Sequence, residues 1–193
     1  MIAIIDYGSG NLTSVKNAFD YLQVESRIVS TPEEIDAADK IVLPGVGTFG
    51  FMMDNLRKKR LETPILNAIK GGKPFLGICL GFQVLFEESE ESKGVKGLGI
   101  FKGKVIKFRK GKVPQIGWNK IIPAKKSIFR EGYAYFVNSY YVKPREKNII
   151  AAKSDYFGDF VSAIRYNKVI GVQFHPEKSG DFGLRVLRRW LKC

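Results

Sequence analysis

Short apolar runs alternate with helix-like segments through the first half of the chain, and this alternation limits the possible folds more than any other feature. The runs at residues 2–5, 26–29, 40–43 and 74–78 have the length and composition of buried strands. A helix is expected after the first run, with apolar residues at 12, 15, 19 and 22 on one face and Asn11 as its N-cap. Strands that alternate with helices through short loops predict a parallel sheet with helices on both faces.

The other expected helices of this half are marked by their starting residues and by glycine-containing loops. Pro32 stands where a short helix would begin, helical stretches follow residue 47 as far as about Gly71, and another helix is expected over residues 80–86. Loops at residues 7–10, 44–47 and 77–81 lie where strands end. Ligands of such sheets bind beyond the carboxyl ends of the strands, so these loops are the expected location of a site.

The second half differs, because short β-branched and aromatic runs dominate residues 103–174. Runs at 105–108, 118–122, 133–142, 149–152 and 169–174 predict added antiparallel strands. A closing helix is expected from about Phe182, with Leu184, Leu187 and Leu191 as its buried stripe. The predicted fold is an α/β three-layer sandwich with a central, mainly parallel sheet plus added antiparallel strands. With 193 residues, the chain is expected to form a single domain, residues 1–193.

The chain is strongly basic, with a formal net charge of +13. Such an excess of basic residues is typical of proteins that bind a nucleic acid, an anionic membrane surface or an acidic protein partner. Lysine-rich solvated surfaces without such a partner are also common. The basic residues are spread along the chain, with a denser patch at residues 93–112 and no separate basic arm. We therefore expect binding neither to nucleic acid nor to a membrane.

The ends and the cysteines of the chain suggest its compartment. Residues 1–6 form a short apolar run without a basic leader, which indicates a strand rather than a signal peptide, and no run approaches the ~18 apolar residues of a membrane-spanning helix. Cys79 and Cys193 make no disulfide scaffold, and one histidine with two distant cysteines does not supply a zinc ligand set. A cytoplasmic protein without metal or cofactor is expected.

The sharpest local signal is the segment 75–81, Phe-Leu-Gly-Ile-Cys-Leu-Gly, in which an apolar strand leads through Gly-x-Cys-x-Gly into a helical segment. This is the thiol form of a nucleophile elbow, whose tight turn exposes the sulfur of Cys79. Gly77 and Gly81 remove the Cβ atoms that would clash there. A helix N-terminus favours a thiolate, and the amide of Leu80 can donate to a developing oxyanion. The alternative interpretation is an inert buried cysteine beside turn glycines.

His175 is the only histidine of the chain, so it is the only possible base for a Cys–His pair. It ends the apolar run 169–174, and Pro176 favours extended geometry at His175. Glu177 can hold one ring nitrogen and leave the other facing the sulfur. A strand-end histidine packed in a loop is the alternative, but three agreeing features favour a catalytic Cys79–His175–Glu177 triad.

These residues and several flanking motifs resemble the class I (triad) glutamine amidotransferases and, more narrowly, the glutaminase subunits of imidazole glycerol phosphate synthase from histidine biosynthesis. The match runs from end to end. It includes residues 6–12 (Asp-Tyr-Gly-Ser-Gly-Asn-Leu), 43–47 (Leu-Pro-Gly-Val-Gly), 77–83 (Gly-Ile-Cys-Leu-Gly-Phe-Gln), 85–89 (Leu-Phe-Glu-Glu-Ser), 117–119 (Gly-Trp-Asn) and 174–179 (Phe-His-Pro-Glu-Lys-Ser). The resemblance implies a flavodoxin-like core for the predicted sandwich.

The resemblance also implies a role for each matching residue. Cys79 would attack the glutamine side-chain amide, His175 would protonate the departing ammonia and later activate water, and Glu177 would orient His175. The oxyanion would be held by the amide of Leu80 and one from Val46–Gly47, after a backbone flip that the glycines of this loop make cheap. The implied substrate contacts are Gln83, Glu91 (facing the α-ammonium group), Ser139 and Tyr140 (near the α-carboxylate).

The implied partner is a (β/α)8-barrel cyclase subunit, which forms a heterodimer with the glutaminase and receives its ammonia. The cyclase would then make imidazole glycerol phosphate and the aminoimidazole carboxamide nucleotide, AICAR. Matching interface positions are Asn11, Trp118, Asn119 and Lys178. The basic charge of the chain would serve docking to an acidic face.

One residue departs from the family pattern, and three other functions remain open. Asn138 stands where the family usually has histidine, so any proton-linked role at that position is absent. A related subunit that supplies ammonia for surface-sugar amidation is one alternative. A stand-alone γ-glutamyl hydrolase on the same fold is a second, and a basic binding module with a relic site is a third. High glutamine turnover without a partner would favour the hydrolase, and salt-dependent nucleic-acid binding without activity at Cys79 would favour the binding module.

Overall fold

The computed structural model describes residues 1–125 and 127–193. The strands are β1 (Ile2–Ile5), β2 (Ser26–Val29), β3 (Lys40–Gly45), β4 (Phe75–Cys79), β5 (Phe86–Ser89), β6 (Phe101–Lys107), β7 (Gln115–Pro123), β8 (Gly132–Asn138), β9 (Tyr140–Pro144), β10 (Ile150–Asp155), β11 (Asp159–Tyr166) and β12 (Val169–Val172). The helices are α1 (Leu12–Tyr21), α2 (Pro32–Ala37), α3 (Phe49–Lys58), α4 (Glu62–Lys70), α5 (Leu80–Gln83) and α6 (Gly180–Leu191), and a 3-10 turn, η1, covers Pro176–Lys178.

A nine-stranded sheet with the order β2-β1-β3-β4-β12-β11-β10-β7-β8 forms the centre of the molecule. Its first five strands are parallel, and the remaining pairs are antiparallel. A second sheet of three strands has the order β5-β6-β9. The expected parallel sheet with added antiparallel strands is therefore confirmed, and the parallel part has the strand order of a flavodoxin-like core.

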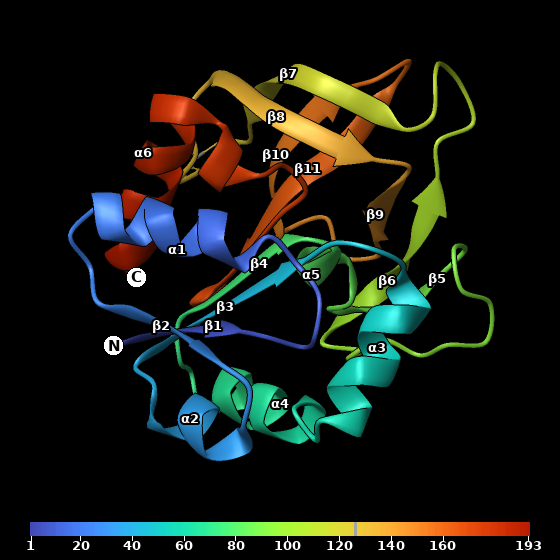
Figure 1. Ribbon diagram of the computed structural model, residues 1–193. Helices are drawn as coiled ribbons and strands as arrows, with labels where there is room; N and C mark the ends of the chain where they lie inside the picture. Colours follow the sequence, from blue (N-terminus) through green and yellow to red (C-terminus); the bar gives the residue numbers. More distant parts are fainter. Residues whose placement is uncertain (126) are drawn as a thin grey trace.

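Two layers of helices cover the parallel strands (Figure 1). The helices α2, α3 and α4 pack on one face together with Ala3 and Ile5 of β1. The helices α1 and α6 pack on the other face, where they meet Ile2 and Ile4 of the same strand. Alternate residues of β1 thus enter opposite cores, and all four are buried, as expected for a strand in the middle of a three-layer sandwich.

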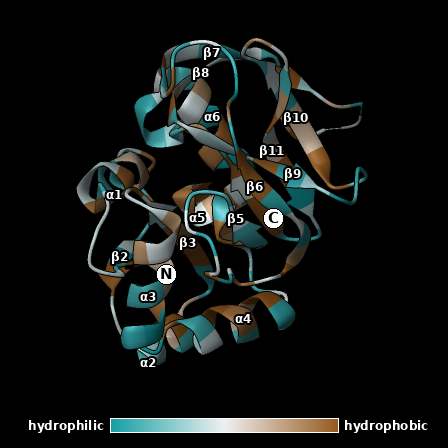
Figure 2. Ribbon diagram, turned by 90° about the vertical axis from the view of Figure 1, so that its right-hand side faces the viewer, coloured by the Kyte–Doolittle hydropathy of each residue, from teal (hydrophilic) through white to brown (hydrophobic). Residues whose placement is uncertain are grey.

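The helices begin and end where local signals favour it. Asn11 caps α1 by accepting from the Ser14 amide, and Thr31 with Glu34 forms a capping box at α2. In Figure 2, α4 carries alternating bands of hydrophobic and hydrophilic residues, as a helix with one face on a sheet should. The buried stripe of α6 differs from the predicted leucines: only Leu187 of these is fully buried, beside Phe182, Val186 and Trp190.

Several predicted elements were wrong in extent or direction. The helix expected over residues 80–86 is the single turn α5, and the chain re-enters a strand at Phe86. The run 133–142 is two strands, β8 and β9, interrupted at Ser139. The run 169–174, predicted as an added antiparallel strand, is antiparallel to β11 but parallel to β4, so β12 joins the two parts of the sheet. The strand β11 was not predicted at all, because its buried residues lie on both faces and give no alternation to recognise.

Among the described residues, no helix has both the length and the apolar character needed to cross a membrane.

Candidate active site

Cys79 lies at the carboxyl end of β4, between the ends of β3 and β12. Its backbone has φ 54° and ψ −109°, a strained conformation for a residue with a side chain and typical of a nucleophile elbow. A Cβ atom on Gly81 would lie 1.8 Å from the Leu43 carbonyl oxygen, so only glycine fits against β3 at that point. Because α5 is a single turn, its dipole would stabilise a negative charge on the sulfur less than the longer predicted helix would. The first amides of α5 still have no acceptors within the helix.

His175 and Glu177 follow β12 and form a close pair. His175 has extended backbone angles, φ −98° and ψ 96°, as expected before proline. Its Nδ1 lies 2.7 Å from Glu177 Oε1, and the two side chains are 7% and 2% exposed. The backbone amide of His175 donates to the Tyr135 carbonyl at 2.9 Å, which anchors this segment to β8. The carboxylate therefore fixes one ring nitrogen and leaves Nε2 for the sulfur.

The electrostatic state of His175 is set by its two neighbours. Burial alone would lower the pKa of His175, but the charge and hydrogen bond of Cys79, followed by those of Glu177, raise this pKa from 6.5 to about 10. With this pKa the ring carries a proton at neutral pH, between the Cys79 sulfur and the Glu177 carboxylate. A protonated imidazole beside a thiol favours its nucleophilic form.

A cavity of about 310 Å³ opens above Cys79. The predicted catalytic, oxyanion and substrate residues line it, apart from Glu177, which lies behind His175. The lining residues are Val46, Gly47, Cys79, Leu80, Gln83, Glu91, Pro114, Val137, Asn138, Ser139, Tyr140, His175 and Lys178. The chain thus brings the predicted site residues together from the end of β4, from α5 and β9, and from the segments after β3, β5, β8 and β12.

Two of the predicted substrate contacts are held by backbone groups. Glu91 accepts a hydrogen bond from the Phe49 amide at 2.7 Å. Burial raises the pKa of Glu91, and the Phe49 bond opposes this rise. Gln83 Nε2 donates to the Tyr140 carbonyl at 3.0 Å. Asn138, at the family's histidine position, is buried and donates to the same carbonyl at 3.0 Å, so it acts as a structural amide.

The predicted oxyanion loop is engaged by a tyrosine. The Tyr7 hydroxyl donates to the Val46 carbonyl at 2.8 Å, and the Val46 amide donates back to that hydroxyl at 3.0 Å. Gly47, with φ +95°, occupies a conformation that favours glycine. In this state the Val46 amide bonds to Tyr7 and is not offered to a substrate oxyanion.

The predicted interface residues fall into two groups. Trp118 is 58% exposed on β7, and Lys178 is exposed at the mouth of the cavity. The side chains of Asn11 and Asn119 form hydrogen bonds within the chain itself. Asn11 caps α1, and Asn119 donates to the Asp155 carbonyl at 2.7 Å.

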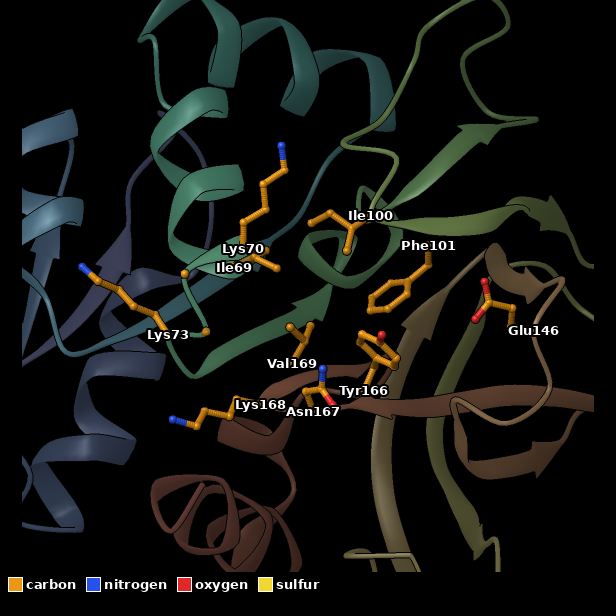
Figure 3. Close-up of a pocket in the computed structure, with 12 residues that line it drawn as sticks. Ile69, Lys70, Lys73, Ile100, Phe101, Glu146, Tyr166, Asn167, Lys168 and Val169 are labelled. Carbon is orange, nitrogen blue, oxygen red and sulfur yellow. The ribbon is translucent and has the colours of Figure 1, made fainter.

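The largest cavity described, about 540 Å³, lies at the opposite end of the parallel strands, near the amino ends of β4 and β12 (Figure 3). Phe101 and Tyr166 form an edge-to-face pair in its wall. Lys70, Lys73 and Lys168 line the cavity but point in different directions, and Lys73 donates to the Ile35 and Asp36 carbonyls. It contains no residue of the predicted triad, and its lysines do not converge, so the smaller cavity is the better candidate for the active site.

Tyr7 and Gln173 contact the site but were not singled out in the sequence. Gln173 Nε2 lies 3.6 Å from the Cys79 sulfur. Its position two residues before His175 was the available signal, because alternate residues of an extended chain share a face. Tyr7 had no comparable signal, since its contact with Val46 joins segments that are distant in sequence.

A strand-end cysteine on a strained elbow, paired with a histidine and a carboxylate over a parallel sheet, defines a thiol-dependent enzyme of the triad amidotransferase class. Residues 3–192 match the family model described as Glutamine amidotransferase class-I, and the chain belongs to this family of glutamine-hydrolysing enzymes.

Curated relatives and solved structures agree with this family. Imidazole glycerol phosphate synthase subunit HisH of Pyrococcus furiosus is 50% identical, with 98% of this chain and 97% of the relative covered. The protein of the same name from Methanothermobacter thermautotrophicus is 48% identical, with 100% and 98% covered. A crystal structure of a glutamine amidotransferase superposes with a TM-score of 0.82 at 18% identity, covering 100% of this chain and 98% of that one, which supports the fold alone.

Proposed function

We propose that the chain, acting as one domain of residues 1–193, is the glutaminase subunit of an imidazole glycerol phosphate synthase. The identity of about half of all residues with relatives of that name supports this assignment. The single observation that carries the chemistry is the buried Cys79–His175–Glu177 arrangement beneath a cavity of about 310 Å³, a volume that suits one amino acid.

The reaction proceeds through a thioester. His175 holds the proton of the Cys79 thiol when the sulfur attacks the amide carbon of glutamine. The carbon–nitrogen bond then breaks while His175 returns the proton to the departing ammonia, which leaves a glutamyl thioester on Cys79. Water attacks this thioester as His175 accepts a proton from it. The carbon–sulfur bond breaks, glutamate leaves, and the thiol is restored with the proton of His175.

The cavity walls supply recognition of glutamine. Glu91 faces the α-ammonium group, and its carboxylate is already oriented by the Phe49 amide. Ser139 and Tyr140 receive the α-carboxylate, and Gln83 contacts the substrate beside them. The amide of Leu80 and one from Val46–Gly47 hold the oxyanion once the loop leaves Tyr7.

The partner is a (β/α)8-barrel cyclase subunit in a heterodimer. An apolar surface beside the cavity supports this. We call it the hairpin patch: the exposed side chains of Ile116, Trp118, Tyr133 and Val137 on β7 and β8, with the half-buried Tyr135 among them. Val137 also lines the cavity, so a partner seated on the hairpin patch would cover the exit for ammonia. The cyclase would use this ammonia to make imidazole glycerol phosphate and AICAR in the cytoplasm, where a reducing environment keeps Cys79 free.

The proposal is tested by measuring glutamine hydrolysis with and without a barrel cyclase of this pathway. Turnover should be weak for the free chain and rise sharply on addition of the cyclase and its nucleotide substrate. High turnover by the free chain would favour a stand-alone γ-glutamyl hydrolase. Activation only by a surface-sugar amidating partner would assign the chain to that pathway instead.

A further inference from the structure

The buried side chain of Gln173 lies against the nucleophile, and the mechanism above gives it no role. Gln173 follows β12 two residues before His175, so the two side chains leave the extended chain on the same face. It is 0% exposed, and its Nε2 lies 3.6 Å from the Cys79 sulfur. A neutral amide N–H at this position can stabilise a thiolate without bringing a second charge into the site.

Two linked hydrogen bonds decide which end of the Gln173 amide faces the sulfur. Gln83 Nε2 donates to the Tyr140 carbonyl and to Gln173 Oε1, both at 3.0 Å. A backbone carbonyl only accepts, so Gln83 must present its NH2 group to Tyr140. The second proton of that NH2 group then requires an oxygen on Gln173. The NH2 group of Gln173 is left facing Cys79.

The sulfur of Cys79 therefore has three different polar neighbours. The thiol donates to the Val137 carbonyl at 3.9 Å, Gln173 Nε2 lies 3.6 Å from the sulfur, and the ring of His175 also hydrogen-bonds to Cys79. Once His175 has taken the proton, the Val137 carbonyl repels the negative sulfur. The Gln173 N–H and the imidazolium then attract it, so the amide favours the thiolate over the thiol.

We propose that Gln173 is a positioning residue, whose Nε2–H holds the Cys79 thiolate in line for attack and whose orientation is locked by Gln83. No atom is transferred to or from Gln173, because the thiol proton goes to His175. Only the identity of the substrate in this inference rests on the proposed function. The effect of Gln173 on the reactivity of the Cys79 sulfur does not depend on it.

Two substitutions test this role. Gln173→Met keeps about the same volume and removes the donor, while Gln173→Glu keeps an oxygen for Gln83 and places another oxygen against the sulfur. The readouts are the rate of iodoacetamide alkylation of Cys79 in the free subunit, followed by peptide mass spectrometry, and kcat and KM for glutamine with the cyclase present. Both variants should be alkylated roughly tenfold more slowly at neutral pH and lose about as much in kcat, with little change in KM.

A matched control separates this role from loss of a buried amide in general. Gln115→Met removes another buried glutamine, which lies outside the contacts of the sulfur, and its thermal midpoint is measured beside that of Gln173→Met. If Gln173→Met does not fold, Gln173→Glu carries the test, because it keeps the bond to Gln83. Wild-type alkylation rates in folded Gln173 variants would overturn the inference. Alkylation needs neither glutamine nor cyclase, so a failed glutaminase assay of the wild-type protein would count against the proposed function alone.

Discussion

Cys79 combines a strained backbone with a sulfur that has three polar neighbours. A φ of 54° in a residue with a side chain costs on the order of 1–3 kcal/mol. The buried strands β3 and β12 hold β4 on both sides and keep Cys79 in this conformation. The reactivity of the sulfur then follows from His175, whose ring is held in turn by Glu177.

The protonation state of His175 can be followed directly, because it is the only histidine. We expect its imidazole NMR signals to titrate far above 6.5, near 10, and to move to a lower pH in Cys79→Ala, since the charge and hydrogen bond of Cys79 raise the pKa. The folded pKa exceeds the unfolded value, so the protonated ring stabilises the fold fully below about 6.5 and this stability is lost as the pH rises toward 10. A ring that is neutral at pH 7 in the wild-type protein would contradict this account.

At the scale of secondary-structure elements, the site is built where the parallel strands end. The loop after β3 carries Val46 and Gly47, and Tyr7 follows β1, the neighbouring strand of the sheet. The two bonds between the Tyr7 hydroxyl and Val46 hold the loop with the Val46 amide turned to the tyrosine. The free subunit thus keeps half of its expected oxyanion hole occupied by its own side chain.

Tyr7→Phe should loosen this loop. The substitution removes both hydrogen bonds without changing the ring, so the free energy of unfolding should fall by about 1–2 kcal/mol. Glutamine hydrolysis by the free subunit should rise, because the Val46 amide no longer has the hydroxyl as its acceptor. Tyr21→Phe, the same change on an exposed side chain, is the control for both measurements. Unchanged or lower hydrolysis by free Tyr7→Phe would show that the tyrosine does not restrain the loop.

Elements that are marked by short sequence patterns could be predicted from the sequence. The strands near residues 2–5, 26–29 and 40–43, the cap at Asn11 and the start of α2 at Pro32 are where the pattern predicts them. The members of the triad could be predicted because only one histidine was available to Cys79, and the structure pairs that histidine with Glu177.

Other features depend on tertiary contacts that no local pattern reveals. The strand β11 is buried on both faces between β10 and β12, and so lacks alternation. The helix α5 stops after one turn because Phe86 pairs with β6 of the smaller sheet, a contact with a distant segment. The contact of Gln173 with the sulfur likewise needs β12 to lie beside β4. Burial and strand pairing, rather than propensity, decide these features.

At the scale of the whole molecule, the cavity above Cys79 adjoins an exposed apolar surface of the antiparallel half. Within the hairpin patch, Trp118 packs against Tyr135, with ring centroids 6.2 Å apart, and Ile116 pairs with Val137. An ordered aromatic pair in an exposed apolar patch is typical of a docking surface. The net charge of +13 would speed association with an acidic partner and make its rate sensitive to salt.

Trp118→Ala should weaken binding to the cyclase roughly 30-fold, because large exposed aromatic residues commonly dominate binding energy when a partner covers them. Isothermal titration calorimetry with the purified cyclase measures the effect. Phe157→Ala removes a comparably exposed aromatic side chain far along the chain, in the turn between β10 and β11, and should leave the affinity unchanged. Equal losses in the two variants would remove the hairpin patch as the docking surface.

The nucleophilic role of Cys79 is the central claim, and one comparison tests it most directly. Product formation by the complex with the cyclase is measured for the wild-type protein and for Cys79→Ala, once with glutamine and once with an ammonium salt as the nitrogen source. We predict that Cys79→Ala forms no product from glutamine but matches the wild-type rate with ammonium. Glutamine-dependent synthesis retained by Cys79→Ala would contradict the account.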